Sequence, residues 1–321
     1  MIYAIGEILL VVIGILIALN INNNNELKKN EQSITSSLKE IQSNLLDDII
    51  ESQNVLETYL ERDSIQKRIF DFKNPSTIDD FKNKKVAILG NFYDDFVINK
   101  NGYENLIRQI DFMPKKYEPI LKDLKKLYVN LNETVNVYNE RIRSTVYSNL
   151  DFVFTQDWEI YRIKHKQISN EETNYYINDN RYKNYIIKYM NDSENLLDIT
   201  MRYRIKAIET YEKIDSILNI KKLELPLHLL GKVNAIELKE YLGTYQFKGE
   251  EGGFLKFYIK NNILYSDYSD SESNDTITYR NYKLSENLYL MDGQVLKFNR
   301  ETSNKVGIEF ITRSWELTKK E

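Results

Sequence analysis

Residues 2–19 form an almost uninterrupted apolar run, IYAIGEILLVVIGILIAL, in which Glu7 is the only charged residue. As a helix this run would span roughly 27 Å, close to the hydrocarbon thickness of a bilayer. Its strictly apolar part, residues 8–19, is shorter, so a signal peptide and a buried core helix are alternatives. No basic residue precedes the run and no Ala-x-Ala follows it, which disfavours cleavage. We predict a retained transmembrane anchor over residues 1–22.

The apolar positions that follow the anchor have a helical period. Ile34, Leu38, Ile41 and Leu45 step by four, three and four residues, which is the spacing of one helix face. Farther along the chain, residues 152–176 have a mixed pattern of apolar and polar positions with no clear helical period. The breaker Asn74-Pro75-Ser76 ends the first helix. The predicted helices cover residues 25–72, 78–89, 103–110, 115–150 and 182–218. They predict a helical bundle across residues 23–224.

After Leu225-Pro226 the pattern alternates with period two and glycine becomes frequent. Asn261-Asn262 and Asp292-Gly293 are typical hairpin turns. These features predict an antiparallel barrel or sandwich over residues 235–321. The chain is therefore predicted to be α+β, with a transmembrane helix, a long-helix bundle and a small β domain. The candidate strands cover residues 241–247, 254–260, 263–268, 276–284, 288–291, 295–299, 305–311 and 314–318.

Small residues recur on one face of the predicted anchor. Gly6, Gly14 and Ala18 are spaced by multiples of four, and small-xxx-small pairs let transmembrane helices approach closely. Glu7 lies on nearly the same side, where it either reaches the headgroups or contacts a partner helix. The anchor therefore predicts a transmembrane helix–helix contact through Gly6, Glu7, Gly14 and Ala18, and with it a homodimer.

Composition narrows the partners. Hydrophobic residues make up 42% of the chain and charged residues 29%, as in folded soluble material. The net charge of −4 gives no excess of basic residues that would bind nucleic acid, so we exclude nucleic acid as a partner. The absence of cysteine excludes disulfides and thiolate metal sites. The expected partners are the lipid bilayer, a second copy of the chain and a protein of unknown identity.

Charge and resemblance point to different orientations. Lys28 and Lys29 follow the anchor, so a literal positive-inside count places the bulk of the chain in the cytoplasm. However, YAIGEILLVVIGILIALNINNNNE resembles the opening of an uncharacterised bacterial family typical of Bacteroidetes. Its members begin with a basic stretch and have Gln and Trp where Asn20 and Asn24 stand here. The resemblance implies a shortened N-terminus, a single pass through the inner membrane and a periplasmic bulk. It implies no activity.

The C-terminal strands have a resemblance of their own. The segments Leu242–Tyr245, Ile263–Tyr265, Leu296–Phe298 and Lys305–Gly307 resemble the small lipocalin-like domain appended to bacterial serine hydrolases. That resemblance implies an accessory β domain. Its interior either holds a small apolar ligand or is simply filled by side chains. The candidate interior residues are Tyr245, Phe257, Tyr265, Leu290 and Phe298.

Catalytic and metal-binding signatures are missing or out of context. His165 and His228 are far apart in the sequence, and no acidic cluster has the D-x-D-x-D-G calcium loop. Ser36-Ser37-Leu38-Lys39 fits S-x-x-K, but Ser36 falls inside a predicted long helix and no K-T-G follows. We predict no enzyme activity, no cofactor and no metal. The expected role is a membrane-anchored interaction or scaffolding protein, with apolar-ligand binding as the alternative and a hydrolase accessory as a distant third.

Overall fold

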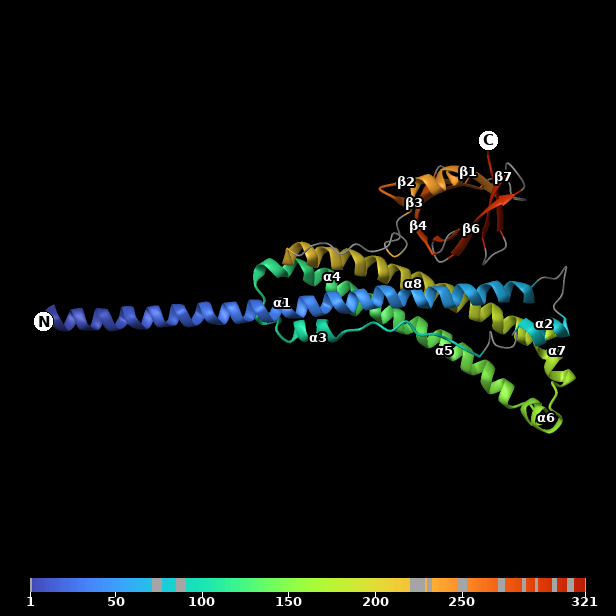
Figure 1. Cartoon of the computed structure of the whole chain (residues 1–321), viewed down its shortest axis with the longest axis horizontal. Coiled ribbons are helices and arrows are strands. Elements are labelled where there is room, and N and C mark those ends of the chain that lie inside the picture. The colour runs from blue at the N-terminus through green and yellow to red at the C-terminus, as the bar shows by residue number, and fades with distance from the viewer. Residues whose placement is uncertain are drawn as a thin grey trace.

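The computed structural model describes residues 2–70, 77–84, 91–219, 229, 233–247, 253–270, 275–284, 287–291, 294–301, 305–310 and 315–320. Helix α1 (Ile2–Ile69) is a single helix of 68 residues. It contains no proline and no glycine after Gly14, so nothing in its backbone chemistry interrupts it. The predicted anchor and the predicted helix that follows it are therefore one element. Its first part extends alone beyond the rest of the molecule (Figure 1).

The polar stretch between the two parts of α1 remains helical. Asn22 Nδ2 donates to Glu26 Oε1 at 3.3 Å and Asn24 Nδ2 donates to Asn20 Oδ1 at 3.2 Å. These contacts join residues four apart on one helix face, which supports the helix where its residues have only modest helix propensity. The apolar part of α1 is thus continuous with the part that enters the bundle.

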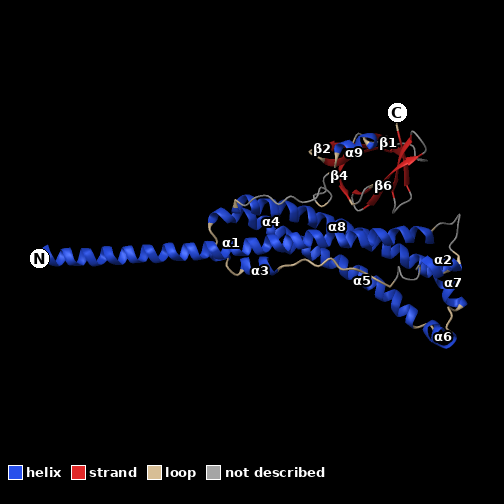
Figure 2. Ribbon diagram, viewed as in Figure 1, coloured by secondary structure: helices blue, strands red, loops and turns tan. Residues whose placement is uncertain are grey.

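The bundle forms where α1 packs on α8 (Asn180–Leu218) and α3 (Asn101–Ile107), while α5 (Asn132–Phe154) packs on α8. Figures 1 and 2 show α1 and α8 side by side along much of their length, with α5 diverging from them towards the far end. The predicted apolar face of α1 is fully buried there, at Ile34, Leu38, Ile41 and Leu45. The helical period of the sequence therefore identified the core face of α1.

The region predicted as one helix over residues 115–150 is more irregular. It begins as the 3-10 helix η3 (Lys115–Ile120), which contains Pro119, a residue without a backbone N–H. It continues as α4 (Leu121–Lys125) and η4 (Lys126–Leu131), a stretch of π-helix, before α5 begins. Apolar periodicity predicted where this helical region lies. It did not predict that the region changes from 3-10 to α to π helix.

Short helices cluster at the end of the bundle farthest from the N-terminus (Figure 1). They are α2 (Ile78–Lys84), α6 (Trp158–His165) and α7 (Asn170–Asn178). Phe81 stacks on Tyr176 at 5.0 Å, and both belong to an aromatic-rich core with Trp158 and Tyr182. This cluster accounts for the mixed pattern of residues 152–176. Residues 85–89 of the predicted helix over 78–89 lie outside the described residues.

The C-terminal strands form one antiparallel sheet in sequence order, and pairing of β1 with β8 closes it into a barrel. The helix α9 (Ala235–Leu238) and the 3-10 turn η5 (Lys239–Tyr241) precede it. Asn261 and Asn262 both have positive φ, as the predicted two-residue hairpin turn requires. Asp292-Gly293 lies outside the described residues. The strands are β1 (Gly243–Phe247), β2 (Gly253–Lys260), β3 (Ile263–Asp270), β4 (Thr276–Lys283), β5 (Leu288–Met291), β6 (Gln294–Glu301), β7 (Lys305–Phe310) and β8 (Trp315–Lys319).

The barrel packs against the bundle with the outer face of β5 and its neighbours. Leu284, Leu290 and Val295 are buried in the same hydrophobic cluster as the helical core. A polar chain crosses the joint, because Gln53 Nε2 donates to Leu284 O at 3.4 Å and Gln53 Oε1 accepts from Arg204 Nη2 at 2.8 Å. Barrel and bundle therefore share part of one core.

Candidate functional site

The apolar end of α1 is a continuous uncovered hydrophobic surface. From Leu10 to Ile21 its large apolar side chains are 47–74% exposed, and none of that stretch is buried. A buried core helix would have these side chains covered, so that alternative does not describe α1. Within the described residues, α1 is long and apolar enough to cross a membrane, a test that signal sequences also pass.

The predicted helix–helix contact residues all lie on this uncovered part of α1. Glu7, Gly14 and Ala18 are exposed, and a Cβ added at Gly14 would meet no atom within 4 Å. Gly6 belongs to α1, but its exposure lies outside what the structure describes. The structure brings none of Glu7, Gly14 and Ala18 against another element. Gly14 and Ala18 are one helical turn apart, as a close helix–helix approach requires.

Three of the predicted interior residues do fill the barrel. Tyr245, Phe257 and Phe298 are each at most 3% exposed and belong to the barrel core. Their rings meet edge to face, with centroids 5.6 Å apart for Tyr245 and Phe257 and 5.4 Å apart for Phe257 and Phe298. Tyr289 adds a third such contact to Phe298 at 5.2 Å. Aromatic packing of this kind stabilises a core.

The other two predicted interior residues face outwards. Leu290 is fully buried, but in the bundle cluster, whereas its neighbours Tyr289 and Met291 belong to the barrel core. Tyr265 is half-buried and stacks on Tyr258 at 5.8 Å, while its neighbour Leu264 is in the barrel core. Because strand side chains alternate between faces, the interior positions are one residue away from those predicted.

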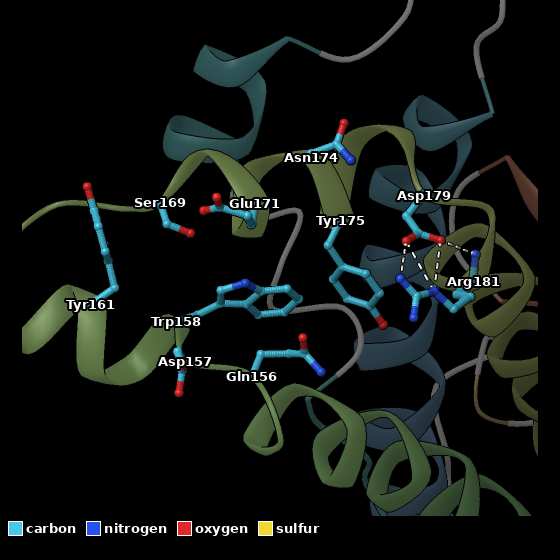
Figure 3. Close-up of a pocket in the computed structure, with 10 residues that line it drawn as sticks. All are labelled: Gln156, Asp157, Trp158, Tyr161, Ser169, Glu171, Asn174, Tyr175, Asp179 and Arg181. Carbon is cyan, nitrogen blue, oxygen red and sulfur yellow. Dashed lines mark hydrogen bonds and ion pairs between the residues drawn. The ribbon is translucent and has the colours of Figure 1, made fainter.

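A pocket of about 530 Å³ opens between α6, α7 and the start of α8, at the far end of the bundle. Figure 3 shows the rings of Trp158 and Tyr175 side by side, and their centroids are 5.1 Å apart. Burial raises the pKa of Tyr175 to about 12. Sequence reasoning missed this pocket, although interleaved aromatic and acidic residues over 156–181 were a visible signal. Its lining residues are Gln156, Asp157, Trp158, Tyr161, Ser169, Glu171, Asn174, Tyr175, Asp179 and Arg181.

Two of the charged residues that line this pocket, Asp179 and Arg181, form a helix cap and an ion pair. Asp179 caps α8 by accepting from Arg181 N, and it pairs with the Arg181 guanidinium at 2.6 Å. Hydrogen bonding by Arg181 lowers the pKa of Asp179. Figure 3 shows the Asp157 and Glu171 carboxylates on different sides of the Trp158 ring, so they do not converge on one ligand position.

A second cavity, of about 490 Å³, lies along α1 where it enters the bundle. It is lined by Lys28, Glu31, Gln32, Thr35, Ser36 and Lys39, so both ends of the S-x-x-K match border it. Ser36 is exposed in the middle of α1 and not at the start of a helix in a cleft. The position therefore lacks the setting that this nucleophile needs.

Metal-ligand geometry is also missing from the described part of the chain. No group of three or more histidine or acidic residues that could hold a metal is found there. His165 stacks on Tyr161 with ring centroids 4.4 Å apart, and His228 lies outside the described residues.

Asp48 and Arg204 are two of the charged residues that are buried in the described part of the bundle. The Asp48 carboxylate accepts from the Tyr203 hydroxyl and from Asn99 N, the latter at 3.1 Å. Burial raises the pKa of Asp48 to about 6. Arg204 is fully buried and donates to Ser52 Oγ at 2.6 Å, but its Nη1 has no partner among the described atoms. Burial lowers the pKa of Arg204 to about 10. Apolar periodicity did not predict the burial of either residue. Asp48 lies on a buried polar stripe of α1 with Asn44 and Ser52, one turn before and after it.

Comparison with known proteins assigns no activity. Residues 7–92 match the model of a family described as "Family of unknown function (DUF6090)", which supports an uncharacterised domain in this part of the chain. No curated protein and no solved structure matches the chain. The N-terminal signature and the lipocalin-like resemblance stay predictions. The N-terminal segment, with the apolar helix and the first part of the bundle, is similar to the DUF6090 family.

Proposed function

We propose that this chain is a single-pass protein of a bacterial inner membrane that acts without catalysis, through protein–protein interaction. In this proposal α1 crosses the bilayer and holds the bundle and barrel on the periplasmic side. One observation carries it: α1 continues without a break from an uncovered apolar segment into the bundle core.

Solvation physics supports a bilayer around the apolar segment. Soluble monomers rarely expose continuous apolar patches larger than a few hundred Å². Consecutive exposed Leu, Val and Ile residues between 10 and 21 surround α1 on all sides. A helix that is apolar all round is typical of a core or of a membrane span. Since the bundle does not cover it, lipid is the natural solvent.

Alkaline carbonate extraction of cell envelopes tests the anchor. The full chain is expected in the membrane pellet, because a spanning helix resists carbonate whereas peripheral proteins are released. A variant with Val12→Arg and Leu16→Arg should weaken retention, since each charge near the bilayer centre costs about 3 kcal/mol on insertion scales. Release of the intact wild-type chain into the supernatant would contradict the proposal.

A second copy of the chain is the first partner to test. Gly14 and Ala18 present small side chains where lipid-facing residues elsewhere are large. Amine-reactive crosslinking in membranes through Lys28 and Lys29 should give a dimer, and Gly14→Ile should lower its yield by blocking close approach. Leu16→Ile, on the opposite side of α1, is the matched control. An unchanged yield with Gly14→Ile would remove this helix face from the proposal.

Ligand binding by the barrel is the alternative proposal, with less support. Tyr245 and Phe298 both contact Phe257, and the three rings occupy the interior that an apolar ligand would need. Native mass spectrometry of the full chain in detergent distinguishes the two: a retained small molecule would favour the alternative, and the bare chain mass would favour a filled core.

A further inference from the structure

We propose that the base of the bundle forms a second contact with the same bilayer. The contact surface, called here the base patch, consists of Leu27, Ile107, Ile110 and Phe112. It would rest in the lipid headgroup layer on the side of the membrane that carries the bundle. This inference depends on the proposed membrane crossing of α1 and adds a peripheral contact to it.

Hydrogen bonds fix the base patch close to the membrane end of the bundle. Gln109 Oε1 accepts from Ser33 Oγ, and the Thr35 and Tyr117 hydroxyls are 3.2 Å apart. Lys116 pairs with Glu31. The link between α3 and α4, which includes η2 (Ile110–Phe112), is therefore held beside residues 31–37 of α1. Figure 1 shows this link at the end of the bundle from which α1 extends towards the N-terminus.

The base patch exposes apolar side chains where a soluble bundle end would be polar. Phe112 is 63% exposed and Leu27 is 62% exposed, and Ile107 and Ile110 are exposed as well. Leu27 lies seven residues before buried Ile34, on the same side of α1, so it extends the core stripe of the bundle towards the bilayer. The patch thus begins one short polar stretch, residues 22–26, beyond the proposed span.

Basic residues flank the patch, but acidic residues offset them. Arg108, Lys115 and Lys28 are exposed around it, while Asp111 and Glu26 are exposed within the same region. Apolar side chains beside long basic ones are typical of segments that lie in a membrane interface. Because the charges nearly cancel, insertion of apolar side chains dominates, and the contact should form on zwitterionic lipid.

The height of the patch requires α1 to tilt. Ten residues separate Ile21 from Glu31, so an upright α1 would hold the bundle base roughly 15 Å beyond the hydrocarbon edge. The headgroup layer extends about 5–8 Å on each side, which leaves a gap. A tilt of about 30–40° towards the α3 side, within the range seen for spanning helices, lowers the patch into that layer, because α3 is offset from α1 by about 10 Å.

Depth-dependent fluorescence quenching tests the contact. The chain has no cysteine, so Phe112→Cys provides a unique site for a bimane label on the full-length protein. The labelled protein is reconstituted into phosphatidylcholine vesicles that carry a nitroxide either near the headgroup or deep in the acyl chain. Fluorescence at residue 112 should be lost with the shallow nitroxide and largely retained with the deep one.

Two matched variants separate this inference from the anchor. Phe154→Cys, at a residue that is 70% exposed at the far end of the bundle, should be quenched by neither lipid. Leu16→Cys, inside the proposed span, should be quenched by the deep nitroxide. Quenching at residue 16 without quenching at residue 112 would overturn the base contact and leave the anchor standing. No quenching at residue 16 would overturn the anchor, and the base contact with it.

Discussion

Asp48 combines a carboxylate with almost complete burial, since it is 3% exposed in the bundle core. Burial raises its pKa to about 6, although hydrogen bonds from Tyr203 and Asn99 act in the opposite direction. Because the folded-state pKa lies above the unfolded-state value near 4, the folded chain holds a proton that the unfolded chain releases. The free energy of unfolding therefore falls as pH rises through this interval.

Asp48→Asn should remove that dependence, because an amide does not titrate and still accepts from Asn99 N. Between about pH 4 and pH 6 the wild type should lose up to about 3 kcal/mol relative to the variant. Urea unfolding of both proteins in the same detergent, followed at several pH values, measures this difference. Curves that stay parallel across the interval would show that Asp48 does not titrate there.

Gly102 allows α3 to lie directly on α1. A Cβ at this position would be 2.7 Å from Ile41 N, and Gly102 N donates to Asn44 Oδ1 at 3.0 Å. Gly102→Ala should therefore destabilise the chain by about 1–3 kcal/mol through overpacking. Gly14→Ala, where a Cβ meets no atom within 4 Å, is the control for overpacking and should not lower the urea midpoint. Equal midpoints for both variants would mean that α3 moves away at no cost.

At the scale of elements, the helices and strands that bury only one face were predictable from the sequence. The helical stripe from Ile34 to Leu45 faces the bundle core. The period-two alternation located strands that the structure has, within about two residues at each end. The hairpin at Asn261-Asn262 follows from residues that tolerate positive φ. Each of these features is decided by local backbone chemistry and a single buried face.

The orientation of strands that are buried on both faces was not predictable from the sequence. β5 reads Leu-Tyr-Leu-Met, apolar on both faces, because one face fills the barrel and the other packs on the bundle. Alternation cannot distinguish the two faces, and Leu290 was assigned to the wrong one. In β3 the buried Ser266 hid the interior face, because its hydroxyl accepts a hydrogen bond from Asn281 Nδ2 at 3.0 Å. The same local view missed the pocket at the far end of the bundle, which several short helices assemble.

Leu290→Ala tests the joint between barrel and bundle. Removing this fully buried side chain should cost about 2–5 kcal/mol, as core truncations do, because the bundle cannot collapse onto the strand. Ile236→Ala, at a residue that is 85% exposed, should change the free energy of unfolding by less than about 0.5 kcal/mol. Chemical denaturation of the full chain measures both. A Leu290→Ala effect as small as that of Ile236→Ala would mean that barrel and bundle do not share a core.

At the scale of the whole molecule, α1 connects every part of the account. The same helix supplies the uncovered apolar segment, the polar link and the first face of the bundle core. A rigid connection of this kind sets the distance and tilt of the bundle relative to a membrane. The barrel, packed on α1 and α8, is carried with it. A bundle and barrel held in this way would present their surfaces to partner proteins.

Topology reporters at both ends of the chain test the central claim, that α1 crosses the bilayer once. Green fluorescent protein, active in the cytoplasm, and alkaline phosphatase, active in the periplasm, are each fused in turn to Met1 and to Glu321. The account predicts fluorescence from the N-terminal fusion and phosphatase activity from the C-terminal fusion. Activity of the same reporter at both ends would contradict it.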